Sequence, residues 1–310
     1  MLPSTAMSAS QSSATWIGYS ALFLWACSGV LASSVIKIPT FEVLSVAFSI
    51  SFGLTALLLT MRRRWTNVKQ PLLLWVIGMI GVYGNDALYI AAFKHAPAAQ
   101  ADLISYLYPI LIILLASYLP SEKFSFKYII AGFLGFFGSY LLITAGGDAT
   151  NFQLKYMTGY FLAFIDAIVW SVYCIAARYY KNTPSEMIGM YCGCGLILSL
   201  IMHISYEQTI IPNLHQTIVL IIMGLTTQGS AYFMWDYGIK RGNFNLLSVL
   251  AYSNPIIAVI LLIIAGKSHY SDTLLIATLL ISLGGALAGI DVKKILGLIR
   301  GPTMPRERHD

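Results

Sequence analysis

Apolar residues fall into ten stretches along the chain, and short segments containing Pro, Asn, Gly or charged residues separate them. A helix needs about 20 apolar residues to cross the hydrocarbon core of a bilayer. The lengths of these stretches and the breaker residues between them predict ten transmembrane helices in an all-α membrane protein. The predicted spans are 15–35, 41–61, 72–93, 98–118, 126–144, 158–178, 187–205, 215–238, 245–266 and 272–290.

The composition excludes a water-soluble fold. Hydrophobic residues make up 57% of the chain and charged residues 10%, and the mean hydropathy is +0.73. A soluble domain carries roughly a quarter charged residues. Because ten spans and their short loops use nearly all of the 310 residues, no room remains for a separate soluble domain.

The basic residues predict the orientation in the membrane. Of the 19 Lys and Arg, 15 lie in loops and the tail on one side of the predicted spans. Cytoplasmic loops are enriched in Lys and Arg, so both termini are predicted to be cytoplasmic in the inner membrane. Residues 1–14 lack the charged start of a secretory signal and predict a flexible tail, and 291–310 predict a basic tail. This topology explains the net charge of +6 without nucleic acid as a partner.

The chain also repeats itself when it is shifted by 145 or 146 residues. The pairs that coincide are Trp25 with Trp170, Lys94 with Lys240, Pro109 with Pro255, and Gly138 with Gly284. We therefore predict two five-helix repeats at 15–145 and 156–290. Because five is odd, the repeats cross the membrane in opposite directions, as in many secondary transporters. An ancient duplication without a transport function would leave the same trace.

The fifth helix of each repeat carries small residues at four-residue spacing. Ala131, Gly135 and Ser139 share one face, and Gly285 and Gly289 share another. Small residues let the backbones of membrane helices approach closely. We interpret these two helices as packing elements without a role in binding substrate.

Charged side chains inside a bilayer require a partner, a water-filled cavity or a function. Asp86 lies in the third span between Tyr83 and Tyr89. Asp166 lies near the middle of the sixth span and shares a helical face with Trp170 and Tyr173. Two interpretations remain open for both aspartates, a role in transport and a protonated carboxyl that bonds to a neighbouring helix.

Two further aspartates lie nearer the ends of spans. Asp236 precedes Lys240 by four residues, a spacing that predicts a helical ion pair. Asp102 lies near the outer end of the fourth span, within reach of Lys94 or the headgroups. We interpret Asp102, Asp236 and Lys240 as structural or gate residues.

Each repeat has a proline in the middle of its fourth span. A proline leaves a carbonyl without its hydrogen bond and bends the helix. Paired interruptions at the membrane midplane are typical of a transporter's binding site, although a kink that serves packing alone is the alternative. The polar or aromatic residues beside Pro109 and Pro255 include Ser105, Tyr106, Tyr252 and Asn254.

Several aromatic residues lie deep in the spans, on faces that also carry polar groups. They are Trp25, Trp170, Tyr173, Tyr232 and Tyr252. A cavity lined by such rings would favour a flat amphipathic solute, or a cation held against a ring face.

No sequence motif indicates an enzyme. Phosphate loops, nucleophile elbows and zinc-protease motifs are all missing from the sequence. The four cysteines lie inside apolar runs at spacings that suit neither disulfides nor a metal. We expect no enzyme activity, no cofactor and no metal, and a receptor or scaffold remains the rival class.

Four segments resemble the drug/metabolite transporter superfamily, and within it the EamA-type ten-helix exporters of aromatic amino acids. The segments are Gly159–Cys174 (GYFLAFIDAIVWSVYC), Tyr106–Pro109 (YLYP), Trp235–Ile239 (WDYGI) and Tyr252–Pro255 (YSNP). The resemblance implies a basket of helices around a central cavity, with the fifth helix of each half packed outside.

The chain departs from this subfamily at four positions that face the implied pathway. Ser105 and Tyr108 stand where the resemblance implies Asn and Trp, Asp236 where it implies Asn, and Asp166 where it implies a small residue. These departures put the substrate in doubt more than the fold.

The resemblance implies an exporter of amino acids, aromatic or other large neutral ones, or of related small metabolites. Efflux of cationic amphipathic compounds and metabolite uptake are the alternatives. Protons are a candidate coupling ion, while the substrate, the direction of transport and the oligomeric state stay open. The candidate substrate-binding residues are Trp25, Tyr83, Asp86, Tyr89, Ser105, Tyr106, Pro109, Asp166, Trp170, Tyr173, Tyr232, Tyr252, Asn254 and Pro255.

Overall fold

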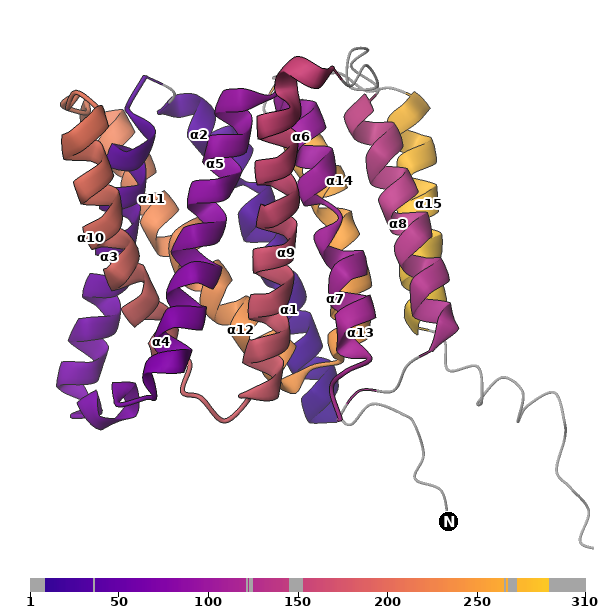
Figure 1. The fold of residues 1–310 in the computed structure, drawn as a ribbon, viewed down its shortest axis with the longest axis horizontal. Helices are drawn as coiled ribbons and strands as arrows, with labels where there is room; N and C mark the ends of the chain where they lie inside the picture. The colour runs from indigo at the N-terminus through magenta and orange to yellow at the C-terminus, as the bar shows by residue number, and fades with distance from the viewer. Residues whose placement is uncertain are drawn as a thin grey trace, which may run out of the picture.

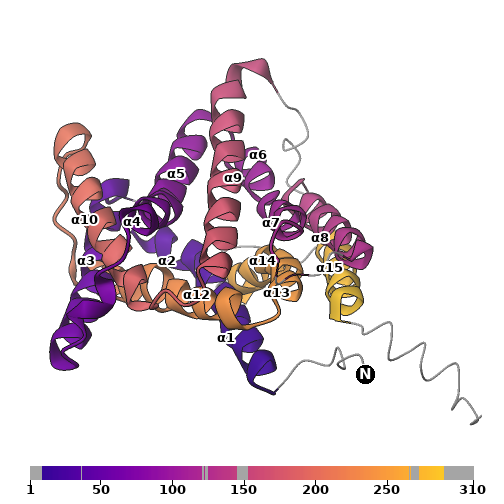
Figure 2. The ribbon, with the colours of Figure 1, turned by 60° about the horizontal axis from the view of Figure 1, so that its bottom comes forward.

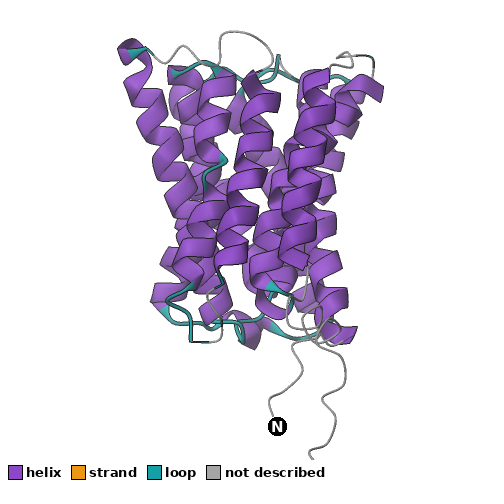
Figure 3. Ribbon diagram, turned by 90° about the vertical axis from the view of Figure 1, so that its right-hand side faces the viewer, coloured by secondary structure: helices purple, strands orange, loops and turns teal. Residues whose placement is uncertain are grey.

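A computed structural model describes residues 9–35, 37–120, 122, 125–144, 153–264, 266 and 272–289. In these residues all regular structure is helical, and the long helices run side by side (Figure 3). The start of α1 and the end of α15 lie on the same face of the molecule, which we call the basic face (Figure 1). An even number of membrane crossings requires this arrangement.

The helices of the described residues group into ten spans, as the sequence predicts. The first half contains α1 (Ala9–Ala26) with α2 (Ser28–Ser34), α3 (Thr40–Met61), α4 (Leu72–Met79) with α5 (Asn85–His95), α6 (Ala98–Ser105) with α7 (Tyr108–Ala116), and α8 (Phe126–Thr144). The second half contains α9 (Met157–Tyr179), α10 (Glu186–Tyr206), α11 (Leu214–Leu225) with α12 (Ala231–Arg241), α13 (Phe244–Leu250) with α14 (Asn254–Ile264), and α15 (Asp272–Gly289).

The observed bounds differ from the predicted ones mainly at the first span. The first helix begins at Ala9 rather than at residue 15, so the predicted N-terminal tail is shorter by six residues. Ser10, Gln11, Ser12 and Ser13 extend the helix although they are polar, because a helix can continue beyond the apolar core of the bilayer. Residues 1–8 and the predicted C-terminal tail, 291–310, lie outside the described residues.

The fourth and ninth spans are interrupted at their prolines. In the fourth, α6 ends at Ser105 and α7 begins at Tyr108, with Pro109 in its first turn. In the ninth, a short 3-10 turn (Ala251–Ser253) separates α13 from α14, and Pro255 follows in the first turn of α14. Proline suits the first turn of a helix because the backbone N–H there has no partner within the helix.

The third span of each half has an interruption of its own, which the sequence analysis did not predict. A π-helical turn joins α4 to α5 at Ile80–Gly84, and another joins α11 to α12 at Thr226–Ser230. These two turns are offset by 146 residues, as the repeat requires. Because π turns in helices are frequent at functional sites, these turns indicate that the third and eighth spans line a site.

The two halves pack through equivalent helices. The principal contacts join α3 to α10, α8 to α15, α1 to α12, and α5 to α9. Each of these pairs takes one helix from each half, and α1 with α12 corresponds to α9 with α5 under the repeat. The halves are thus related by an approximate two-fold axis, with the hydrophobic core between them.

The fifth helices, α8 and α15, stand together at one edge of the molecule, while α3 and α10 stand at the opposite edge (Figures 1 and 2). Gly284 lies so close to α8 that a Cβ atom there would be 2.7 Å from the carbonyl oxygen of Ala131. Gly138 lies equally close to Ile281 of α15. The two fifth helices therefore pack closely, but only part of the predicted face is used. Gly284 lies against Ala131 and Gly135, whereas Gly285 lies against Leu250 of α13.

Candidate functional site

A cavity of about 510 Å³ lies between the two halves. Its lining extends to Val35 and Ile38, which lie between α2 and α3 on the face opposite the basic face (Figure 1). Nine of the predicted substrate-binding residues line it: Trp25, Asp86, Tyr89, Ser105, Tyr106, Asp166, Trp170, Tyr232 and Asn254. The volume is within the usual range for a pocket that binds a small molecule.

Three aromatic side chains form one wall of the cavity. The ring centroids of Trp25 and Trp170 are 5.8 Å apart, and Tyr232 lies 5.5 Å from Trp25 and 5.9 Å from Trp170. All three pairs meet edge to face, an arrangement that aromatic rings favour. The indole N–H of Trp25 donates to the backbone oxygen of Thr227 at 3.0 Å, which fixes the ring. The wall is therefore apolar and rigid.

Asp166 connects three helices at one side of the cavity. Its Oδ2 accepts a hydrogen bond from the hydroxyl of Ser105 at 2.8 Å, and its Oδ1 accepts from the amide of Asn85. The Asp166 side chain is buried, since the residue is only 3% exposed. Two donors therefore compensate for much of the cost of burying this carboxylate.

Asp86 has fewer partners. Its Oδ1 accepts a hydrogen bond from the hydroxyl of Tyr232 at 3.1 Å, whereas its Oδ2 is buried without a hydrogen-bond partner. A buried polar atom without a partner is costly, and more so if it carries charge. This position therefore suits a bound proton or a cationic group from a solute.

The two interrupted spans meet beside the cavity. The hydroxyl of Tyr106 donates to Oδ1 of Asn254 at 3.0 Å, and the amide of Asn254 donates to the backbone oxygen of Leu22 at 3.0 Å. Tyr106 lies between α6 and α7, and Asn254 begins α14. The interruptions thus bring side chains of the two halves into contact at the cavity.

The cavity lies on the two-fold axis that relates the halves. Trp25 and Trp170 occupy equivalent positions of the repeat and contact one another. Asp86 and Tyr232 are likewise equivalent, being 146 residues apart, and they share a hydrogen bond. Residues related by a two-fold axis can touch only near that axis, so a solute in the cavity would contact both repeats.

Five of the predicted binding residues do not line the cavity. Tyr173 is buried behind Trp170, on which it stacks at 5.4 Å, because it lies one helical turn further towards the basic face. Tyr252 is fully buried against Gly135 of α8. Tyr83 packs near Phe48 in the core. Tyr173 shares a face of α9 with Trp170 but does not line the cavity, because the cavity ends before this part of the helix.

Pro109 and Pro255 are the other two, and both are buried outside the cavity. Their effect on the site is indirect. Each lies in the first turn of the helix that follows an interruption. The residues at the interruptions that line the cavity are Ser105, Tyr106 and Asn254. The prolines therefore shape the site without lining it.

Two of the predicted gate residues, Asp236 and Lys240, lie away from the cavity. Nζ of Lys240 and Oδ2 of Asp236 are 2.8 Å apart, as their spacing predicts. Ser185 donates to the same carboxylate oxygen at 2.8 Å, and Lys240 also donates to the backbone oxygen of Thr183 at 3.0 Å. The side chain of Asp102 lies outside the described residues. A gating role for these residues stays a prediction.

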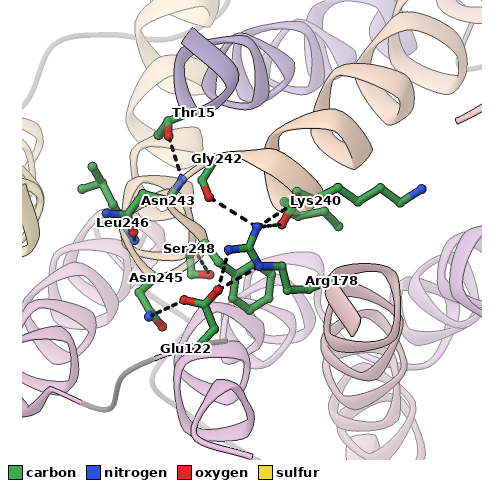
Figure 4. Close-up of polar contacts among 11 residues, drawn as sticks. Thr15, Glu122, Arg178, Lys240, Gly242, Asn243, Asn245, Leu246 and Ser248 are labelled. Atoms are coloured by element: carbon green, nitrogen blue, oxygen red, sulfur yellow. Dashed lines mark hydrogen bonds and ion pairs between the residues drawn. The ribbon is translucent and has the colours of Figure 1, made fainter. Parts of the chain in front are cut away.

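A polar network joins the ends of α9 and α12 to Glu122 and Asn245 at the basic face, and no sequence pattern predicts it (Figure 4). The guanidinium of Arg178, at the end of α9, pairs with Glu122 at 2.5 Å and also donates to backbone oxygens at the end of α12, at 3.1 Å to Ile239 and 2.7 Å to Lys240. Glu122 also accepts from the amide of Asn245. Both ends of the ion pair lie in loops or at helix ends, where charge is common, so the sequence held no signal of their contact.

Two polar side chains are among the lining residues that the sequence did not predict. Asn85 bonds to Asp166, and Gln228 lies in the π-helical turn of the eighth span. Both are polar residues inside apolar stretches, and that position was a usable signal.

The described part of the chain holds no group of His, Cys, Asp and Glu suited to a metal ion. Ten spans in two related halves, with a cavity on the axis between them, define a multi-pass membrane transporter. Two stretches, residues 12–144 and 157–290, match the model of the EamA-like transporter family. The chain belongs to this family, which consists of transporters and not of enzymes.

Proteins similar to this chain include exporters of aromatic amino acids. The aromatic amino acid exporter YddG of Ancylobacter novellus is 34% identical over 90% of this chain and 98% of its own length. The protein of the same name from Escherichia coli strain K12 is 26% identical over 54% of this chain and 58% of its own length. A solved crystal structure superposes with a TM-score of 0.87 at 32% identity, covering 92% of this chain and 99% of that one. The resemblance to this superfamily is therefore confirmed.

Proposed function

We propose that this protein is a secondary exporter of amino acids, in particular aromatic or other large neutral ones, or of related small metabolites. The observation that carries the proposal is the cavity on the axis between two inverted halves. Such a site can be exposed to either side in turn by rocking one half against the other. The names of its relatives support export rather than uptake.

The lining of the cavity supports a solute with an apolar ring and a polar end. The wall of Trp25, Trp170 and Tyr232 suits the ring, since aromatic pairs are worth about 0.5–1.5 kcal/mol beyond the area that they bury. Asp86 and Asn254 lie at the same cavity and suit an ammonium group and a polar backbone. Protons are the coupling ion that we propose, because the Asp86 carboxyl could take up a proton when no solute is present.

The structure contains the cavity in one state of access. We infer that it is open to the outside, since the Arg178 network joins the ends of helices at the basic face and we place both termini in the cytoplasm. Export then requires this network to separate while the opposite end of the cavity closes.

Efflux of cationic amphipathic compounds is the second candidate. Among the described residues that line the cavity there is no Lys or Arg, whereas Asp86 and Asp166 both line it. A solute with one positive charge and no carboxylate would complement this lining more fully than a zwitterion does. The unpartnered Oδ2 of Asp86 is the specific observation in its favour.

A counterflow experiment tests both candidates. The purified protein is reconstituted into liposomes loaded with unlabelled solute, and uptake of labelled solute is followed. We expect exchange of phenylalanine, tryptophan or leucine, with glycine exchanged far less. Exchange of phenethylamine without phenylalanine would favour the second candidate, and exchange of neither class would contradict both.

A further inference from the structure

A second hollow of about 710 Å³ lies between α3 and the π-helical turn with α12, and it shares no lining residue with the central cavity. We call it the side groove. Its lining residues are Ser51, Leu54, Thr55, Leu58, Leu59, Arg62, Arg64, Ser185, Glu186, Leu225, Gly229, Ser230, Phe233 and Met234. Most of its wall is apolar, and its charged residues are confined to the end at the basic face.

The side groove faces the lipid. Leu54 and Leu58 of α3 are 44% and 48% exposed, and Leu225 of α11 is 39% exposed. Gly229 and Ser230, from the π-helical turn, are small residues that leave space between the two helices. In a membrane this space lies at the depth of the acyl chains, because α3 is a complete span.

At the basic face the side groove adjoins a third hollow of about 510 Å³, which we call the basic pocket. The two share Arg64, Ser185 and Glu186. The lining residues of the basic pocket are Arg64, Asn67, Lys181, Asn182, Thr183, Pro184, Ser185, Glu186, Tyr237, Lys240 and Arg241. The mostly apolar side groove therefore borders a polar pocket at the edge of the bilayer.

Positive charge in these two hollows exceeds negative charge. Lys240 is paired with Asp236, but the structure gives no ion pair to Arg62, Arg64, Lys181 or Arg241 among the described residues. The carboxylate that lines both hollows is Glu186, which accepts a hydrogen bond from Asn67 at 3.3 Å. Unpaired cations at the end of an apolar groove complement an anionic headgroup attached to an acyl chain.

We propose that an anionic phospholipid binds here, with an acyl chain in the side groove and its phosphate beside Arg62 and Arg64. α3 belongs to the first half of the molecule and α12 to the second, so the lipid would contact both. A lipid held in this way stabilises the arrangement in which α3 and α12 enclose the groove. The proposal depends on neither the substrate nor the direction of transport.

Lipid binding to the purified protein tests the proposal without any transport measurement. Dioleoyl phosphatidylglycerol is titrated into delipidated protein in detergent, and bound lipid is counted by native mass spectrometry while the Tm is recorded. We expect a lipid that stays bound and raises the Tm by several degrees, with dioleoyl phosphatidylcholine at least fivefold weaker. Equal binding of both lipids would overturn the proposal.

A double variant, Arg62→Gln with Arg64→Gln, should lose at least fivefold in phosphatidylglycerol binding. Arg63→Gln is the matched control, because Arg63 lies between the two and lines neither hollow. All three side chains are exposed, so the variants should fold. Unchanged binding in the double variant, or an equal loss in the control, would contradict the site.

Acyl-chain binding in the side groove is tested with a phosphatidylglycerol that has shorter acyl chains. Dihexanoyl phosphatidylglycerol should bind at least fivefold more weakly than the dioleoyl lipid, because it fills less of the side groove. If it binds equally, or if inorganic phosphate raises the Tm as much, then the basic pocket is a site for soluble anions and the lipid proposal is wrong.

Discussion

The two aspartates that line the cavity differ in their hydrogen-bond partners. Asp166 is held by Ser105 and Asn85, whereas one oxygen of Asp86 has no partner. A hydrogen-bond donor beside a carboxyl favours its ionised form. Asp86 has fewer such donors than Asp166, so its carboxyl is better suited to bind and release a proton during a transport cycle.

We expect Asp86→Asn to abolish the dependence of flux on a pH gradient, because an amide keeps the acceptor for Tyr232 but cannot carry a proton. Asp166→Asn should have the same effect, through loss of the charge that Ser105 and Asn85 stabilise. Flux into proteoliposomes with and without a pH gradient measures this. Full pH-driven transport in both variants would show that the carboxylates are structural.

Trp170→Ala should weaken the apparent affinity for aromatic and large aliphatic amino acids at least tenfold. Burial of a large side chain against such a wall is worth about 1.5–3 kcal/mol, which corresponds to a factor of ten or more. Small solutes such as threonine should be affected much less. Competition assays measure the affinities, and Trp16→Ala, at an exposed position on α1, is the control. A uniform loss for all solutes would indicate misfolding or a gate.

At the scale of elements, helix interruptions build the site. Two spans are broken at prolines and two at π-helical turns, each at equivalent positions of the two halves. In a continuous helix the side chains point in directions set by the helical repeat. A break in the helix changes the direction of the side chains that follow it. Asp86 and Tyr232 both lie just after such a break.

The contacts at the basic face depend on the end of α9. Arg178 and Glu122 are only 11% and 10% exposed in their side chains, so removing one partner leaves a poorly solvated charge. We expect Arg178→Gln to destabilise the protein by about 3 kcal/mol and to increase access to the cavity from the basic face. Thermal unfolding in detergent measures the first effect, with the exposed Lys69→Gln as control. An unchanged Tm would show that the network contributes little.

At the scale of the whole molecule, the repeat places one site on the axis between two halves of opposite orientation. Span one packs on span eight in the same way as span six packs on span three. The two sides of the membrane therefore meet equivalent pairs of helices. This symmetry makes two similar states of access possible with one set of helices. It also explains why the cavity is lined by both halves.

The orientation of the whole chain in the membrane is also a testable prediction. With 15 of the 19 Lys and Arg on one side of the spans, we expect residues near Met1 and near Asp310 to be cytoplasmic. Reporter fusions at each terminus measure this directly. An external location for either terminus would contradict the predicted orientation.

The sequence alone determined the number of spans, the repeat and the packing of the fifth helices. These follow from the length of apolar runs and from local spacing, which act within a few turns of helix. It also indicated Asp86, Asp166, Trp25 and Trp170, because charge and large rings at membrane depth are unusual.

Only the tertiary structure decided which of these residues meet. Tyr173 shares a helical face with Asp166 yet lies behind the cavity, and Asn85 joins the site from another span. The contact of Arg178 with Glu122 joins residues 56 positions apart in the chain. Such contacts depend on the crossing angles and ends of several helices at once, and no local pattern of residues encodes these.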